Sequence, residues 1–205
     1  MLEIRHKNND NDVLVLEDKR SRTFALNEYA DAGVQIPRVA YEHWGKGTVR
    51  PHTCYPHWSI YLIHDGRLHC ENAGGKVGKH SVLFFPPDSP RGITCHDGSV
   101  ELGLILMSGT EVEALAESTI GAGFQHIVPA DFPMVWRHFE MMLSDALSGR
   151  HDAHALCSLW ARIILQTLST VPSVRSARGR TSTLPARAKQ LMDDHWVRLA
   201  NARVV

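Results

Sequence analysis

The chain has 205 residues, a formal net charge of zero and four cysteines. That length allows one domain of ordinary size with an appendage. No apolar run approaches the length of a membrane span, and residues 1–12 are too polar for an export signal, so no membrane partner is expected. The cysteines at positions 54, 70, 95 and 157 form no Cys-x-x-Cys pair, which predicts reduced thiols in a cytoplasmic protein.

Residues 13–107 have the pattern of a small all-β domain. Short apolar runs alternate with turn signals such as Gly74-Gly75 and Pro86-Pro87. Asp65-Gly66 and Asp97-Gly98 are the clearest turn candidates, because Asp and Gly tolerate the positive φ angles of a type I′ turn. A turn at Asp65-Gly66 would produce a hairpin with two distinct faces.

One predicted hairpin face carries His57, Ser59, Tyr61, Ile63, Leu68 and Cys70. This face mixes polar and apolar groups, as the lining of a ligand cavity inside a barrel does. The other predicted face carries Trp58, Ile60, Leu62, His64, Arg67 and His69. We expect other elements to cover part of that second face.

After residue 108 the apolar period becomes helical, with helices predicted at 111–119, 131–147 and 153–171. Asp131 is a predicted N-cap, Pro133 lies in the first turn, and Gly149 ends the helix. The third helix carries a broad apolar stripe of Leu156, Leu159, Trp160, Ile163, Ile164 and Leu168. The two long helices would either cover a sheet or form an antiparallel dimer seam, within an α+β fold.

The last 34 residues differ from the body in charge. Residues 172–205 have a formal charge of +5 and the first 171 residues one of −5. A Ser/Arg-rich stretch at 172–185 precedes an amphipathic helix at 186–200, whose apolar face needs a partner surface. The basic tail favours either a polyanion partner or a solvated linker.

The segment 47–92 resembles the two motifs of a cupin barrel. The first motif is matched by Gly47, His52-Thr53-Cys54 and the run from Trp58 to Gly66, and the second by the run from Ser81 to Arg91. A cupin followed by two helices, a linker and a further helix is similar to the AraC family of transcription regulators. That resemblance implies a cupin-type antiparallel β-barrel (jelly roll) that senses a small-molecule effector, helices that form a homodimer, and helix-turn-helix units that bind DNA.

On this resemblance the chain has four parts. A cupin-like effector-binding barrel occupies 1–108, a helical dimerisation segment 109–171, a basic linker 172–185, and the first helix of a truncated DNA-binding domain 186–205. Since the chain would then lack a recognition helix, we expect at most weak, salt-sensitive and non-specific DNA binding through its basic tail.

The cupin metal motif is depleted in this sequence. Metal-binding cupins place His-x-His and a Glu in the first motif and another His in the second. At those positions this chain has His52 and Cys54, Ser59, and Arg91, whose permanent positive charge opposes a cation. We therefore expect no metal or other cofactor, with a ligand set of His52, Cys54 and His57 as the competing hypothesis.

A metal-free barrel would recognise its effector through side chains. The candidates are Arg38, His52, His57, Tyr61 and Arg91. Arg91 would bind a carboxylate, phosphate or sugar hydroxyl through its several donors, or would simply be a surface residue beside a turn. His57 and Tyr61 would donate hydrogen bonds or be satisfied core residues. Arg38, which follows Pro37 and is predicted to lie ahead of the first barrel strand, would close over the cavity mouth by analogy with sugar-sensing relatives.

Sequence templates for catalysis are missing. The chain has no Gly-x-Ser-x-Gly elbow, no phosphate-binding Gly-rich loop before a helix and no His-Glu-x-x-His pair. The sequence thus favours a ligand-responsive transcription regulator and not an enzyme. The alternative is a stand-alone metal-dependent cupin enzyme of the sugar-phosphate isomerase or dioxygenase type.

Overall fold

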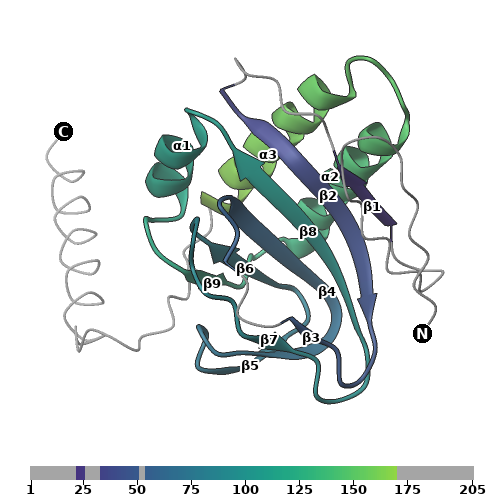
Figure 1. Ribbon diagram of the computed structural model, residues 1–205, viewed down its shortest axis with the longest axis vertical. Coiled ribbons are helices and arrows are strands. Elements are labelled where there is room, and N and C mark those ends of the chain that lie inside the picture. The colour runs from purple at the N-terminus through teal and green to yellow at the C-terminus, as the bar shows by residue number, and fades with distance from the viewer. Residues whose placement is uncertain (1–21, 26–32, 51–53, 170–205) are drawn as a thin grey trace, which may run out of the picture. The chain divides into compact units, whose positions relative to one another are not determined.

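The computed structural model describes residues 22–25, 33–50 and 54–169 (Figure 1). The chain divides into two compact units, Met1–Arg175 and Ser176–Val205. The second unit lies outside the described residues, as does the segment 170–175. The predicted linker at 172–185 and the predicted helix at 186–205 therefore stay predictions.

The strands of the described residues are all paired antiparallel and build two connected sheets. The larger sheet has the order β1-β2-β8-β4-β6-β9, while the smaller one joins β3, β7 and β5 to the end of β4. Their bounds are β1 Arg22–Ala25, β2 Gln35–Trp44, β3 Val49–Arg50, β4 Trp58–Cys70, β5 Gly75–Gly78, β6 Ser81–Phe85, β7 Ile93–Thr94, β8 Val100–Ser108 and β9 Gln125–Ile127.

The strand β4 belongs to both sheets, and the predicted hairpin turn at Asp65-Gly66 is wrong. The pairing of β4 with β8 shifts register between Ile63 and Asp65, which marks a bulge. Gly66 has a φ of 84°, and a Cβ atom there would collide with the main-chain carbonyl of Ser99. Only glycine fits this bend, so the Asp-Gly pair redirects a continuous strand instead of reversing it.

The predicted division of β4 into two faces is nevertheless confirmed for its apolar residues. The bulge shifts the in-and-out alternation by one residue, as a hairpin turn would also have done. Tyr61, Ile63, Leu68 and Cys70 lie in a buried cluster inside the barrel. Trp58, Ile60 and Leu62 lie in a second cluster, together with residues of the helices.

The other predicted turns lie in connections between strands. The β4–β5 hairpin reverses through residues 71–74, where Gly74 has a φ of 72°. Asp97-Gly98 lies between β7 and β8, and Gly98 has a φ of 74°. Because β7 and β8 do not pair with each other, this is a turn but not a two-residue hairpin.

The three predicted helices are present as α1 Val112–Thr119, α2 Phe132–Leu147 and α3 Ala153–Ser169. The start signal of α2 is confirmed, since the Asp131 carboxylate accepts a hydrogen bond from the Met134 N–H at 3.0 Å. Gly149, with a φ of 65°, follows the end of this helix. Figure 1 shows α2 and α3 running together along one face of the larger sheet.

The apolar stripe predicted for α3 is partly wrong. Leu159 and Ile163 are 56% and 39% exposed. The residues that α3 buries are Ala153, Cys157, Ala161, Ile164, Leu165 and Leu168. The first half of this buried face consists of small side chains, which allow close packing, and the Cys157 Sγ lies 3.5 Å from the Met142 carbonyl of α2. Of the predicted stripe, Ile164 and Leu168 are thus buried, while Leu159 and Ile163 face outwards.

The predicted α+β class is confirmed, with an antiparallel two-sheet barrel followed by helices. One core fills the barrel between the sheets, and the other lies between the larger sheet and the helices. Within the described part of the chain, no helix combines the length and the hydropathy that a membrane span requires.

Candidate functional site

Arg91 is fully buried, so the alternative of a solvated surface residue is wrong. It lies in the loop between β6 and β7, and its Nη2 donates a hydrogen bond to the His57 carbonyl at 3.1 Å. Its guanidinium carbon lies 4.4 Å from the centre of the Tyr55 ring and 5.6 Å from that of Phe85. Burial lowers the pKa of Arg91, while the nearby phenol of Tyr61, which also has a side-chain hydrogen bond with the guanidinium, and that of Tyr55 act in the opposite direction.

Tyr61 lies on β4 inside the barrel and is buried. Its ring meets that of Phe85 edge-on, with the centroids 5.7 Å apart. Burial raises the pKa of Tyr61 to about 12, although the charge of Arg91 lowers it in part. The phenol therefore stays neutral near pH 7 and keeps its hydrogen available for donation.

Glu42 holds a polar cluster together on β2 and is only 4% exposed. Its Oε1 accepts a hydrogen bond from Arg38 Nη2 at 3.0 Å. Its Oε2 accepts hydrogen bonds from Arg50 Nη2 and Trp44 Nε1, each at 2.8 Å. Burial alone would lower the pKa of Arg50, but the attraction of Glu42 outweighs it and the pKa is raised.

Strand register places the Glu42 cluster and Tyr61 on the same face of the sheet. Across β8, Ala40 pairs with Leu104 and Leu104 pairs with Tyr61. Ala40, Leu104 and Tyr61 all belong to the core inside the barrel. Side chains two positions apart on a strand share a face, so Arg38 and Glu42 point to the barrel interior on either side of Ala40. Their strand, β2, lies about 10 Å from β4, because β8 runs between the two.

The two parts form one electrostatic neighbourhood. Arg50 and Arg91 both interact with the phenols of Tyr55 and Tyr61. Among the described residues, Arg38 and Arg50 share the Glu42 carboxylate, whereas no ion pair joins Arg91 to a carboxylate. The excess of positive charge suits a polar or anionic molecule better than a cation.

The structure does not bring all five residues predicted to bind the ligand to one place. Arg91 and Tyr61 lie together inside the barrel. The contact between His57 and Arg91 uses the main-chain carbonyl of His57. Arg38 lies within β2, not ahead of the first long strand, and pairs with Glu42. His52 lies outside the described residues.

Sequence reasoning missed Glu42, Arg50 and Tyr55. One signal was present, because Arg38, Ala40, Glu42 and Trp44 alternate along a strand-like run that begins after Pro37. That spacing places the Arg38 guanidinium and the Glu42 carboxylate on one strand face. Arg50 and Tyr55 are brought to this face by long-range pairing, for which the sequence pattern gives no sign.

No three His, Cys, Asp or Glu side chains come together as a possible metal site within 33–50 and 54–169. Cys54, one member of the competing three-ligand hypothesis, is exposed. His52, another member, lies outside the described ranges, so the expectation of a metal-free barrel remains a prediction.

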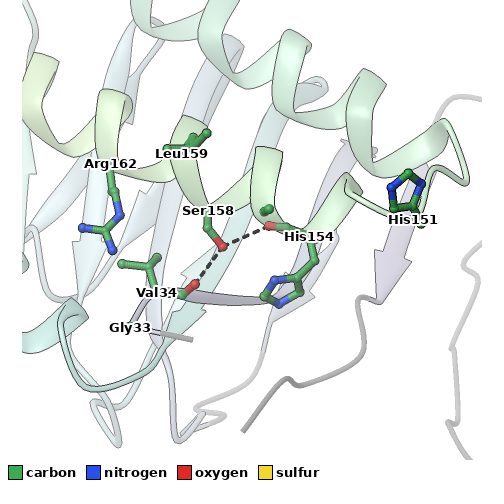
Figure 2. A pocket seen from close by; sticks show the side chains of 8 residues that line it. Gly33, Val34, His151, His154, Ser158, Leu159 and Arg162 are labelled. Atoms are coloured by element: carbon green, nitrogen blue, oxygen red, sulfur yellow. Dashed lines mark hydrogen bonds between the residues drawn. The ribbon is translucent and has the colours of Figure 1, made fainter. Parts of the chain in front are cut away.

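A surface groove lies between the start of β2 and α3 (Figure 2). It is lined by Gly33, Val34, His151, His154, Ala155, Ser158, Leu159 and Arg162. Figure 2 shows the Ser158 hydroxyl between the Val34 and His154 carbonyl oxygens, at 2.7 and 2.9 Å. Arg162 also pairs with Glu111 ahead of α1, at 2.6 Å. The contacts with Val34 and Glu111 attach α3 to its neighbours, so we interpret the groove as a structural seam.

No family model matches the chain, and no curated protein matches it. Solved structures do align with it. An RmlC-like cupin protein with a double-stranded β-helix fold from Methanocaldococcus jannaschii is 10% identical, with a TM-score of 0.36, over 54% of this chain and 94% of that one.

Two further structures align over smaller parts of the chain. A cupin-like protein of unknown function from Ralstonia eutropha is 18% identical, with a TM-score of 0.32, over 37% of this chain and 48% of that one. A variant of oxalate decarboxylase from Bacillus subtilis is 17% identical, with a TM-score of 0.31, over 37% of this chain and 22% of that one. This chain thus spans less than half of either protein. At these TM-scores the likeness assigns neither an activity nor a ligand to this chain.

Proposed function

We propose that this chain is the ligand-sensing and dimerisation region of an AraC-type DNA-binding transcription regulator. It binds a small polar or anionic effector inside the barrel and controls attached helix-turn-helix units. The observation that carries this proposal is the polar cluster around Glu42, Tyr61 and Arg91 on the inner face of the barrel.

The rest of that inner face is apolar. The barrel core consists mainly of aliphatic and aromatic side chains from β4, β6, β7 and β8. A buried ion cluster in such surroundings is expensive to desolvate, and apolar replacements of similar volume are often as stable. Oriented donors inside a mainly apolar enclosure are, however, what recognition of a small polar molecule requires. The cluster therefore supports a binding role for the barrel and not a purely structural one.

Dimerisation is assigned to α3. Leu159 and Ile163 lie one turn apart on this helix, and both large apolar side chains are exposed. We propose that a second copy of the chain covers them, in keeping with the helical dimer seam of the AraC resemblance. Paired barrels would then set the spacing of two DNA-binding units on their half-sites.

A reporter assay tests the dimer. The whole 205-residue chain, fused to a DNA-binding domain that represses only as a dimer, should repress its reporter. Leu159→Asp with Ile163→Asp should abolish repression, because a dimer would bury both charges. Val49→Asp, which charges an equally exposed apolar residue outside the helical segment, is the matched control and should leave repression intact. Equal repression by the wild type and the double variant would refute an interface on this face of α3.

Metal analysis separates the regulator from the alternative of a metal-dependent cupin enzyme. Protein purified without chelator should contain far less than one metal ion per chain, because Arg91 places a permanent cation inside the barrel. Stoichiometric iron, manganese, zinc or nickel, lost on His52→Ala, would overturn the proposal in favour of the enzyme.

A further inference from the structure

Arg91 is a buried cation whose hydrogen-bonding capacity is mostly unused. The guanidinium donates through Nη2 to the His57 carbonyl and also has a side-chain hydrogen bond with Tyr61, but its Nε and Nη1 have no hydrogen-bond partner among the described residues. In the same part of the chain no carboxylate forms an ion pair with it. Arg91 is fully buried, so bulk water does not satisfy these donors either.

Such a group is costly unless something else compensates for it. A guanidinium keeps its charge under ordinary conditions, so Arg91 does not escape the cost of burial by losing a proton. The aromatic rings of Tyr55 and Phe85 supply cation–π contacts at 4.4 and 5.6 Å. Those contacts attract the positive charge through the ring faces but accept no hydrogen bonds from the N–H groups. The missing interaction is therefore an acceptor, and preferably a negatively charged one.

The neighbouring cations differ from Arg91 in this respect. Arg38 and Arg50 both donate to the Glu42 carboxylate, which also accepts from Trp44. Glu42 is thus already committed to three donors on the β2 side of the barrel. It leaves the charge of Arg91 uncompensated, next to the neutral phenol of Tyr61.

We propose that Arg91 binds the anionic group of the effector, a carboxylate or a phosphate, and that Tyr61 lies beside that group as a neutral donor. This inference rests on the proposed sensing function and narrows it from a polar or anionic ligand to an anion. Glu42 acts as a positioning residue that keeps Arg38 and Arg50 from competing for the ligand. A carboxylate and a phosphate both present negatively charged oxygens that accept hydrogen bonds from several N–H groups at once.

The test measures thermal unfolding of the whole chain with three probes at equal ionic strength: sodium benzoate, inorganic phosphate and glucose. One anion should raise the melting temperature by about 3 to 6 °C at ten times its dissociation constant. Arg91→Gln should be at least as stable as the wild type without ligand, since it removes an uncompensated charge, and should lose the response to the anion. Arg150→Gln, which removes an exposed arginine that pairs with Asp152, is the matched control and should respond like the wild type.

The outcomes distinguish a failure of the anion assignment at Arg91 from a failure of the sensing function of the barrel. Benzoate without phosphate identifies a carboxylate effector, and phosphate without benzoate a phosphorylated one. A response to an anion that persists in Arg91→Gln overturns the inference, as does a response to neither anion. A response to glucose alone overturns the anion class while leaving a sensing barrel in place. If Arg91→Gln does not fold, Arg91→Lys, which keeps the charge and changes the donors, should weaken anion binding at least about tenfold, and unchanged binding would refute the assignment.

Discussion

Replacing Glu42 by glutamine tests how much the buried polar cluster contributes to stability. Glu42→Gln keeps the shape of the side chain but removes the charge that three donors share. Breaking a fully buried ion pair costs about 3 to 5 kcal/mol, because the partner charges remain buried without compensation. The side chains of Arg38 and Arg50 are 23% and 22% exposed, so water screens them in part and the lower end of that range applies. We expect a loss of about 3 kcal/mol in the free energy of unfolding.

Urea unfolding followed by far-ultraviolet circular dichroism measures this loss. With a denaturant dependence of about 2 kcal/mol per molar, the midpoint should fall by about 1.5 M. Asp97→Asn is the matched control, because it removes a carboxylate that is 75% exposed and pairs with Lys76 at 3.5 Å. That variant should change stability by less than about 0.5 kcal/mol. A Glu42→Gln midpoint within 0.3 M of the control would show that the cluster does not hold the β2 side of the barrel together.

Three further predictions follow from local features of the fold. Gly66→Ala should lose about 2 to 3 kcal/mol in the urea assay, because the new Cβ meets the Ser99 carbonyl at a φ of 84°, whereas Gly98→Ala, with open space around it at a φ of 74°, should lose only about 1 kcal/mol. Ellman's reagent at pH 8 should label one thiol quickly, that of exposed Cys54, because the other three cysteines are buried and burial raises the pKa of Cys157 to about 12. A second fast-reacting thiol would contradict the burial of those three cysteines. Burial lowers the pKa of His126 below its ordinary value of 6.5. As the pH falls below 6.5, the imidazole is therefore protonated in the unfolded chain before it is protonated in the folded one, and the free energy of unfolding should decrease. His126→Gln should make this decrease with pH less steep, and an equal decrease in the variant and the wild type would refute the role of His126.

Much of the fold followed from local signals in the sequence. Asp131 and Gly149 identified the ends of α2 because capping depends on a few neighbouring residues. The Asp65-Gly66 pair misled us because the same positive φ serves a turn and a bulge. Pairing of β4 with β8 and with the smaller sheet decides between them, and that pairing is not written in the local sequence.

The candidate site was predicted only in part, for a related physical reason. Arg91 and Tyr61 were found from motif position and strand alternation, and the structure places them together. The partners of Glu42 come from β2 and β3, and the ion cluster forms only when these strands close over the same barrel interior. The burial of Arg91 likewise depends on Tyr55 and Phe85, which lie in different segments of the chain.

Hydrogen exchange of the whole chain tests most directly whether the barrel interior receives the effector. The exchange of backbone amides would be compared with and without whichever of benzoate and inorganic phosphate raises the melting temperature more. We predict slower exchange at residues 35–44, 58–63 and 91–95, which carry or adjoin the polar cluster, in the wild type but not in Arg91→Gln. Protection confined to the groove beside α3, or no protection in the barrel strands, would contradict an effector site inside the barrel.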